Sequence, residues 1–211
     1  MRQQVKPNHY FSRSYNSKER FISYWNQINE LTILEPSSIL EIGIGNSFVL
    51  DYLCNNGYNI TAMDIDPCLN PDAVGSINNL PFSASSFDAV ACFEVLEHLP
   101  YSQFQTSLRE LYRVSKKHVA LSIPDANWVY QLYFQMPAIR EVKKLVQIPM
   151  LRIPKHEFDG QHYWEIGKAS YPLKRITKDI EAIGFIIQKT YRVFEVPYHR
   201  FFILKKVKDD T

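Results

Sequence analysis

A run of β-favouring residues that leads into two closely spaced glycines constrains the fold more than any other feature of the chain. The run SSILEIGI at 37–44 is followed by Gly45, and Gly43 lies within its end. Glycine lets the backbone approach a ligand that a side chain would block. Residues 46–57 then have the apolar spacing of a helix and end at Gly57, which is typical of a helix C-terminus. The core is therefore expected to begin with a strand, a glycine turn and a helix.

Strand-like and helix-like segments continue to alternate up to residue 124. Strands are expected at 58–66, 87–94 and 118–124, with a helix over 101–115. This alternation predicts a parallel sheet that is covered by helices on both faces. Residues 172–183 are expected to form a further helix, and two long strands joined through Pro197 must then run antiparallel, because their link is short.

The segments on either side of this core suggest how the chain is organised. Residues 17–34 have helical spacing, and Ser17 is the expected N-cap. We therefore interpret 1–35 as an N-terminal helical cap and 36–211 as the main domain. Residues 125–165 mix aromatic, basic and proline residues. We expect them to form an inserted helical segment, which is either an acceptor pocket or lid, or a packed helical pair with a solvated basic face.

The composition excludes several classes of protein. The net charge is +2, from 24 basic and 22 acidic residues, which does not indicate a nucleic-acid groove. The three cysteines form no C-x-x-C pair, so neither a disulfide framework nor a zinc cluster is expected. The sequence has no apolar run of the roughly 20 residues that span a bilayer, and no signal-peptide core. We therefore expect a cytoplasmic protein without a transmembrane segment.

The residues around the glycine turn indicate which ligand it binds. The next strand ends at Asp64, about 20 residues further on, where an acid can bind both ribose hydroxyls. A dinucleotide site would have a third small residue where this chain has Phe48, and there is no P-loop. The pattern therefore favours a nucleoside without a pyrophosphate, and S-adenosylmethionine fits that description.

Four segments in order, ILEIGIGNS, TAMDIDP, INNLPFSASSFDAV and FEVLEHLP, resemble class I S-adenosylmethionine-dependent methyltransferases of type 11. The resemblance covers residues 36–124, and more loosely the remainder to 205. It implies a doubly wound, Rossmann-like α/β fold. The expected sheet has seven strands and is mostly parallel, with an antiparallel last strand and a helical lid insertion. The implied cofactor is S-adenosylmethionine, and the product is S-adenosylhomocysteine.

The resemblance also implies roles for individual residues. Glu41 would face the methionine amino group, Gly43 and Gly45 the middle of the cofactor, and Asp64 the ribose. The residues implied near the adenine are Ile65, Ser76 and Ile77, and those near the methionine end are Cys92 and Phe93. Two positions depart from the family pattern, which often has a glycine at Ser47 and an aspartate at Ser76.

Methyl transfer needs positioning of the acceptor and often a base, for which we select His98 or His162. Residues 95–98 are expected to form a helix or a turn. Glu94, Glu97 and His98 have i, i+3, i+4 spacing and, if the segment is helical, share one face. This element resembles the E-x-x-E-H motif of ubiquinone-pathway O-methyltransferases and of enzymes that methylate the 3′ end of small RNAs. By that resemblance His162 would complete a divalent-metal site. Related members with EVLEHL use no metal, so both readings stay open.

The acceptor is constrained mainly by what the sequence lacks. The strand ending at Phe93 is not followed by Asn-Pro-Pro-aromatic, as in enzymes that methylate the exocyclic nitrogens of bases, and no basic tract suggests a nucleic acid. We expect O-methylation of a small molecule, lipid precursor or glycan. The alternatives are a non-catalytic cofactor-binding partner protein and a metal-assisted RNA 2′-O-methyltransferase. The aromatic residues expected either to close over the cofactor or to be ordinary core are Phe11, Tyr15, Phe21, Tyr24 and Trp25.

Overall fold

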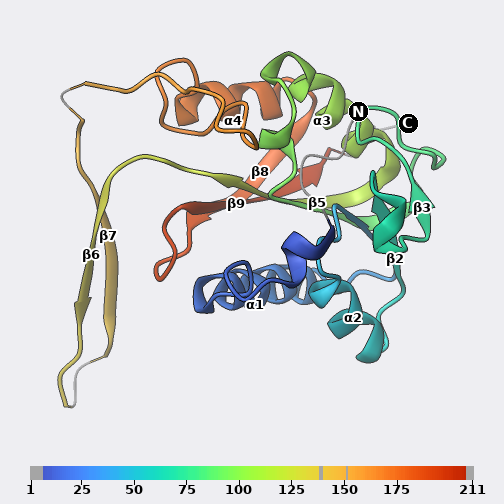
Figure 1. Cartoon of the computed structure of the whole chain (residues 1–211), viewed down its shortest axis with the longest axis horizontal. Coiled ribbons are helices and arrows are strands. Elements are labelled where there is room, and N and C mark those ends of the chain that lie inside the picture. The colour runs from blue at the N-terminus through green and yellow to red at the C-terminus, as the bar shows by residue number, and fades with distance from the viewer. Residues whose placement is uncertain (1–6, 138–139, 151, 208–211) are drawn as a thin grey trace.

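The computed structural model describes residues 7–137, 140–150 and 152–207, and its centre is a seven-stranded sheet (Figure 1). The strand order is β3-β2-β1-β4-β5-β9-β8. Every neighbouring pair from β3 to β5 is parallel, and β9 runs antiparallel to both β5 and β8. The strands are β1 Ile39–Ile42, β2 Ile60–Asp64, β3 Ala73–Val74, β4 Phe87–Phe93, β5 Ser115–Pro124, β8 Phe185–Arg192 and β9 His199–Lys206. The predicted mostly parallel seven-stranded sheet with an antiparallel last strand is confirmed.

Helices cover both faces of this sheet (Figure 1). The helices α1 (Lys18–Ile33) and α2 (Phe48–Asn55) lie on one face, and α3 (Phe104–Val114) and α4 (Leu173–Glu181) lie on the other. Side chains alternate along each strand, so successive residues enter different cores. On β4, Ala91 packs with the α1 and α2 side, and Cys92 packs with the α3 and α4 side. Short 3-10 turns complete the fold at Pro7–Phe11 (η1), Pro67–Leu69 (η2), Leu96–His98 (η3) and Tyr101–Gln103 (η4).

The helix α1 starts as its sequence predicts. The Ser17 hydroxyl accepts a hydrogen bond from the Arg20 amide at 3.3 Å, which satisfies one of the free donors of the first turn. Glu30, further along α1, binds Lys189 of β8 at 2.6 Å and accepts a hydrogen bond from Tyr191. Polar contacts therefore supplement apolar packing in holding α1 against the edge of the sheet.

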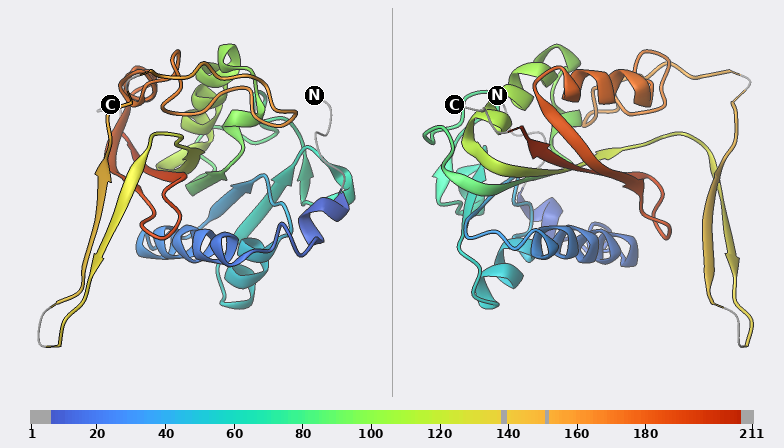
Figure 2. Two further views of the ribbon diagram at one scale, coloured as in Figure 1. Left: turned by 60° about the vertical axis from the view of Figure 1, so that its left-hand side comes forward. Right: turned by 180° about the vertical axis from the view of Figure 1, so that it is seen from behind.

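The insertion after β5 differs from the sequence-based prediction. The described residues of 125–165 contain no helix, and β6 (Val129–Phe134) pairs antiparallel with β7 (Val142–Gln147) instead. Figure 2 shows this ribbon extending away from the body of the molecule. The expectation of a helical lid was wrong because the apolar residues Tyr130, Leu132 and Phe134 recur every second position, the period of a strand and not of a helix. Among the described residues, no helix is long and apolar enough to cross a membrane.

The ribbon is joined to the body through a buried aspartate. Asp125 follows β5 and is fully buried. Its Oδ2 is 2.6 Å from Nε of Arg200, and its Oδ1 is 3.5 Å from the Arg192 guanidinium. The Asp125 amide also donates to the Tyr198 carbonyl at 2.7 Å. Main-chain and ionic contacts of Asp125 therefore both hold the junction between β5 and β6 against β9.

Candidate active site

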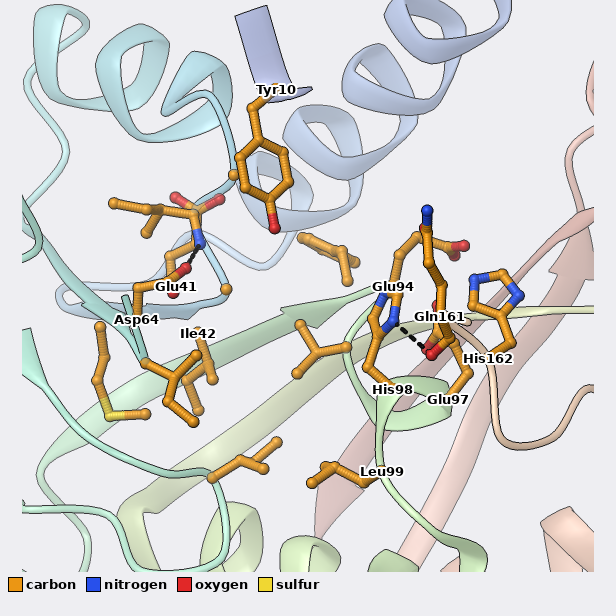
Figure 3. Close-up of a pocket in the computed structure, with 18 of the residues that line it drawn as sticks. Tyr10, Glu41, Ile42, Asp64, Glu94, Glu97, His98, Leu99, Gln161 and His162 are labelled. Carbon is orange, nitrogen blue, oxygen red and sulfur yellow. Dashed lines mark hydrogen bonds between the residues drawn. The ribbon is translucent and has the colours of Figure 1, made fainter. Parts of the chain in front are cut away.

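A cavity of about 590 Å³ lies at the carboxyl ends of β1, β2 and β4 (Figure 3). In open α/β sheets this is the edge where ligands bind. Residues from the N-terminal segment, from the strand ends and from 158–163 line the cavity. The sequence-predicted residues that line it are Glu41, Gly43, Gly45, Asp64, Ile65, Ser76, Ile77, Phe93, Glu94, Glu97, His98 and His162. Cys92 does not line it, because its side chain is fully buried among the apolar residues on the α3 side of the sheet.

The turn after β1 requires glycine at Gly43. This residue has φ +82°, and a Cβ atom placed on it would lie only 2.4 Å from Cγ2 of Val95. Gly45 also has a positive φ, but the nearest atom to its added Cβ would be 3.5 Å away, an ordinary contact. Ser47 has φ +61°, in the left-handed region that glycine adopts without strain. The position at which the sequence departs from the family pattern is therefore one where the backbone favours glycine.

Asp64, the last residue of β2, is bound to the glycine turn. Its Oδ2 accepts a hydrogen bond from the Ile44 amide at 2.9 Å, and its Oδ1 accepts one from the Asp66 amide at 2.9 Å. Burial raises the pKa of the Asp64 carboxyl, while these backbone hydrogen bonds act in the opposite direction. Each carboxylate oxygen can accept more than one hydrogen bond, so Asp64 can also receive hydroxyl donors from a ligand.

Glu41 lies in β1 with its carboxyl group buried beside the cavity. Burial, followed by the nearby carboxyls of Asp51 and Asp64, raises its pKa to about 8. Its Oε2 atom has no hydrogen-bond partner in the described part of the chain. A buried acceptor without a partner is costly, so this atom suits a ligand that brings a donor or a positive charge.

The N-terminal segment forms one wall of the cavity. Tyr10, Tyr15 and Tyr24 line it, and the rings of Tyr10 and Tyr15 meet edge to face at 5.3 Å. Asn46 joins this wall to the glycine turn, because it accepts from the Tyr24 hydroxyl at 3.0 Å and donates to Asn16. Of the aromatic residues expected to close over the cofactor, Tyr15 and Tyr24 lie there, whereas Phe11, Phe21 and Trp25 are largely exposed. Tyr10 was not anticipated from the sequence, since η1 shows no helical periodicity.

Two histidines and a glutamate meet at the other end of the cavity (Figure 3). Glu97, His98 and His162 each place one possible ligand atom within 4.8 Å of the others. Neither carboxylate oxygen of Glu97 has a hydrogen-bond partner among the described residues. Burial, followed by the charge of Glu94, raises the pKa of Glu97 well above its usual value. Burial and the adjacent His162 lower the pKa of His98, which favours its neutral imidazole.

Glu94 is not part of this three-residue cluster. It has φ +53° directly after β4, and the turn η3 begins only at Leu96. The helical condition for a face shared by Glu94, Glu97 and His98 is therefore not met, because three residues of 3-10 turn cannot carry an i, i+4 pair. Glu94 instead lies 3.9 Å from Nε2 of His199, a residue that also contacts the Ser23 hydroxyl at 2.8 Å.

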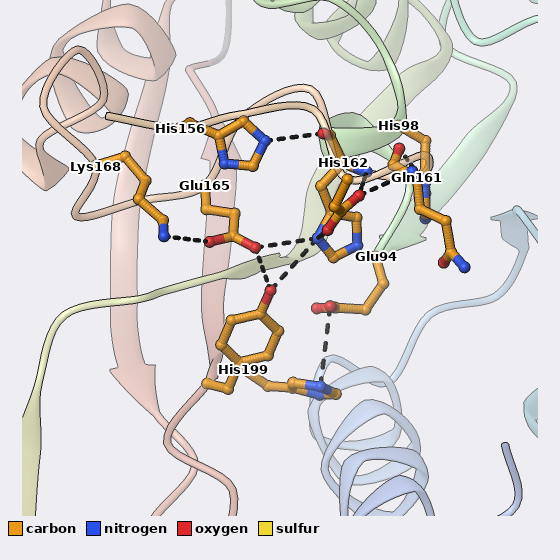
Figure 4. Close-up of polar contacts among 10 residues, drawn as sticks. Glu94, His98, His156, Gln161, His162, Glu165, Lys168 and His199 are labelled. Carbon is orange, nitrogen blue, oxygen red and sulfur yellow. Dashed lines mark hydrogen bonds and ion pairs between the residues drawn. The ribbon is translucent and has the colours of Figure 1, made fainter. Parts of the chain in front are cut away.

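A network of side chains that sequence analysis did not find surrounds His162 (Figure 4). Oε1 of Glu165 lies 3.2 Å from Nδ1 of His162, and the Tyr198 hydroxyl donates to the same oxygen. Lys168 lies 3.6 Å from the other oxygen. Burial alone would raise the pKa of Glu165, but the hydrogen bonds from His162 and Tyr198 and the charge of Lys168 lower it to about 2. The only sequence signal for this pair was the i, i+3 spacing of His162 and Glu165.

Nδ1 of His98 lies 3.1 Å from the carbonyl oxygen of Gln161. Both histidines of the cluster therefore have Nδ1 beside an acceptor, a carbonyl for His98 and a carboxylate for His162. A proton on Nδ1 leaves the lone pair on Nε2. An imidazole with its lone pair on Nε2 can act either as a general base or as a metal ligand, and both roles use the same geometry.

Comparison with known proteins identifies the class that this fold and cavity define. Residues 40–123 match the family model described as a methyltransferase domain. This match and the seven-stranded sheet together support an S-adenosylmethionine-dependent methyltransferase with S-adenosylmethionine as its cofactor. The class predicted from the four sequence segments is confirmed. No curated protein matches the chain significantly by sequence.

Solved structures share the fold at low sequence identity. An S-adenosylmethionine-dependent methyltransferase from Clostridium acetobutylicum has 9% identity and a TM-score of 0.63, and the match covers 95% of this chain and 99% of that one. A 1,6-didemethyltoxoflavin-N1-methyltransferase from Burkholderia thailandensis has 14% identity and a TM-score of 0.57, with 99% and 93% covered. Magnesium protoporphyrin IX methyltransferase from Synechocystis has 15% identity and a TM-score of 0.56, with 90% and 83% covered. These similarities concern the fold.

Proposed function

We propose that this protein transfers the methyl group of S-adenosylmethionine to a hydroxyl group of a small-molecule, lipid-precursor or glycan acceptor. The single observation that carries the proposal is the pairing of His162 with Glu165 at the cavity wall, opposite the glycine turn. A carboxylate on Nδ1 orients an imidazole and stabilises the charge it gains when Nε2 takes a proton. A hydroxyl acceptor must lose such a proton as it attacks the methyl group.

The other end of the cavity supports our assignment of the cofactor site. Asp64 would accept hydrogen bonds from the ribose hydroxyls, and the unpartnered Glu41 oxygen would pair with the ammonium group of the methionine moiety. Ile65, Ser76 and Ile77 would lie around the adenine, and Phe93 near the methionine end. This assignment leaves His98 and His162 at the end where an acceptor would meet the methyl group.

Small-molecule acceptors are favoured by the charge of the chain and by the size of the cavity. A net charge of +2 supplies no strong attraction for a nucleic-acid backbone. A cavity of about 590 Å³ is within the range of small-ligand sites. Two structurally similar enzymes are named for compounds of this kind, a toxoflavin precursor and a magnesium porphyrin.

The test is turnover with a panel of hydroxyl acceptors, measured as S-adenosylhomocysteine formed. His162→Ala should lower turnover by about 100-fold, a typical contribution of a general base, while S-adenosylhomocysteine binding stays unchanged. His118→Ala, on β5 outside the cavity, is the matched control and should keep full turnover. Full turnover of His162→Ala with an accepted substrate would refute the role of the base.

Glu97 favours a second candidate, in which Glu97, His98 and His162 bind a divalent cation. Its buried carboxylate has no hydrogen-bond partner, and both histidines have their Nδ1 atoms engaged, as metal-binding histidines do. When bound, such a cation would act as a Lewis acid on the acceptor hydroxyl. Dialysis against a chelator distinguishes the two candidates. Loss of turnover that manganese restores supports the cation, and unchanged turnover supports the metal-free base.

A further inference from the structure

The β6–β7 ribbon has one strongly apolar face. Directly opposed residues of an antiparallel pair place their side chains on the same face. The register pairs Tyr130 with Val146, Leu132 with Lys144 and Phe134 with Val142. We call these six residues the apolar ribbon face. Trp128 and Met136 continue the same alternation at its two ends, and every apolar member of the face is exposed.

The opposite face of the ribbon is turned toward the body. Nε2 of Gln131 donates to the Phe194 carbonyl at 2.6 Å, and Lys143 binds Glu195 at 2.9 Å. Phe194 and Glu195 belong to the connection between β8 and β9. Polar contacts therefore hold one face of the ribbon near the protein, and the apolar ribbon face is directed away from these contacts.

A ribbon of this kind needs a partner. A two-stranded hairpin alone is marginally stable in water, and contiguous exposed apolar patches mark interaction sites. We propose that the apolar ribbon face docks on an anionic lipid surface. Trp128 and Tyr130 are the residue types that settle at a membrane interface, and the face contains no acidic residue.

Charge supports a lipid surface as the partner. Within the described part of the ribbon, Glu141 is bound by Lys143 at 2.6 Å, whereas Lys144 forms no ion pair with any described residue. Lys144 lies on the apolar face itself, opposite Leu132. At a membrane its long side chain can keep the ammonium group among anionic headgroups while the apolar side chains enter the interface.

A second copy of the chain fits the same face less well. Packing two such faces together would bury Lys144 of each copy against apolar side chains without a counter-charge, which is costly. The six paired residues with Trp128 and Met136 are also far fewer than the roughly 20 to 30 residues a side of a stable protein interface. A membrane requires neither a counter-charge from the partner chain nor a large complementary surface.

Co-sedimentation of the full chain with vesicles tests the proposal, and its outcome does not depend on methyl transfer. The wild-type chain should sediment with phosphatidylcholine vesicles that contain roughly a third phosphatidylglycerol, and salt should weaken this binding. Vesicles of phosphatidylcholine alone should bind at least about fivefold less.

Two neighbouring residues of β7 provide a matched pair of variants. Val146 lies on the apolar ribbon face and Gln147 on the opposite face, and neither lines the cavity. Val146→Asp should weaken vesicle binding by about tenfold or more, while Gln147→Asp, which adds the same charge, should weaken it much less. Unchanged S-adenosylhomocysteine binding shows that each variant is folded.

Three results would overturn the proposal. These are no sedimentation of the wild-type chain with anionic vesicles, equal effects of the Val146 and Gln147 substitutions, and a dimer in sedimentation velocity that Val146→Asp dissociates while vesicles bind neither form. The last result would assign the face to a second copy of the chain.

Discussion

The Asp64 carboxylate accepts a hydrogen bond from the Ile44 amide at 2.9 Å, so the end of β2 is bound to the glycine turn after β1. The acid expected to bind the ribose is thus also part of the structure that shapes the cavity. Replacing Asp64 by alanine would remove both its bond to the glycine turn and its expected bond to the ribose. A conservative substitution is needed to separate these two roles.

Asp64→Asn keeps an acceptor oxygen for one backbone amide but loses the charge. Because charged acceptors bind about twice as strongly as neutral ones, we expect about tenfold weaker binding of S-adenosylhomocysteine by calorimetry. Asp72→Asn is the control, since Asp72 accepts a hydrogen bond from the Ala62 amide of β2 but does not line the cavity. Equal affinity losses in the two variants would contradict a direct role of Asp64.

Glu41 should make stability depend on pH in the chain without cofactor. Its pKa is about 8 in the folded chain against its ordinary value of 4.5, so the folded state holds this proton more tightly than the unfolded state. The stabilisation that protonated Glu41 adds to the free energy of unfolding is fully present below about pH 4.5. It is lost as the pH rises to about 8. Glu41→Gln should flatten this part of the slope in urea unfolding. Burial of Glu97 acts in the same direction, so a smaller slope remains.

The same residue predicts pH-dependent cofactor binding. An ammonium group pairs with the ionised carboxylate, so affinity for S-adenosylhomocysteine should rise with pH toward about 8. Methylthioadenosine, which has no amino-acid group, should lack this dependence. If Glu41→Gln retains the full rise in affinity, Glu41 does not bind the ammonium group.

Gly43→Ala should prevent both tight folding of the turn and cofactor binding. Its new Cβ would meet Val95 at 2.4 Å in addition to the strain of a positive φ. Gly57→Ala is a matched control, because Gly57 has φ +83° and no atom within 4 Å of an added Cβ. The control should cost about 1–2 kcal/mol of unfolding free energy from backbone strain alone. We expect a larger loss of unfolding free energy for Gly43→Ala, with no detectable S-adenosylhomocysteine binding. Equal losses in the two variants would show that the Val95 side chain moves aside to make room for the new Cβ.

Ser47→Gly should stabilise the chain. The left-handed conformation of Ser47 carries strain that glycine avoids, although glycine gains more freedom in the unfolded chain. The expected net gain is up to about 1 kcal/mol in thermal or urea unfolding. Ser37→Gly, just before β1, has no positive φ to relieve and should not stabilise. A loss of stability in Ser47→Gly would show that the serine side chain contributes more than the backbone strain removes.

The sheet and the cofactor end of the cavity could be predicted because both depend on local pattern. Buried parallel strands give apolar runs, and a turn between strand and helix gives glycines such as Gly43 at fixed positions. Asp64 followed from its distance to that turn. These signals lie within short stretches of sequence, where spacing determines geometry.

The acceptor end could not be predicted as fully. His162 contacts Tyr198, which comes from a different part of the chain, and no spacing rule relates the two. The ribbon was mistaken for helix because prolines and mixed aromatic and basic residues obscured its period of two. Sequence spacing left helix and turn open after Phe93, and the left-handed backbone of Glu94 ends the regular geometry that an i, i+3, i+4 argument assumes.

The buried contacts of Asp125 limit the orientation of the ribbon relative to the sheet. Moving Asp125 away from β9 would break its contact with Arg200, and separating a buried ion pair costs about 3–5 kcal/mol. The base of the ribbon is therefore held in place, and the contacts of Gln131 and Lys143 with the β8–β9 connection limit its orientation further. Any surface on which it rests would hold the mouth of the cavity at a set height and tilt, and this height would limit which acceptors can reach the methyl group.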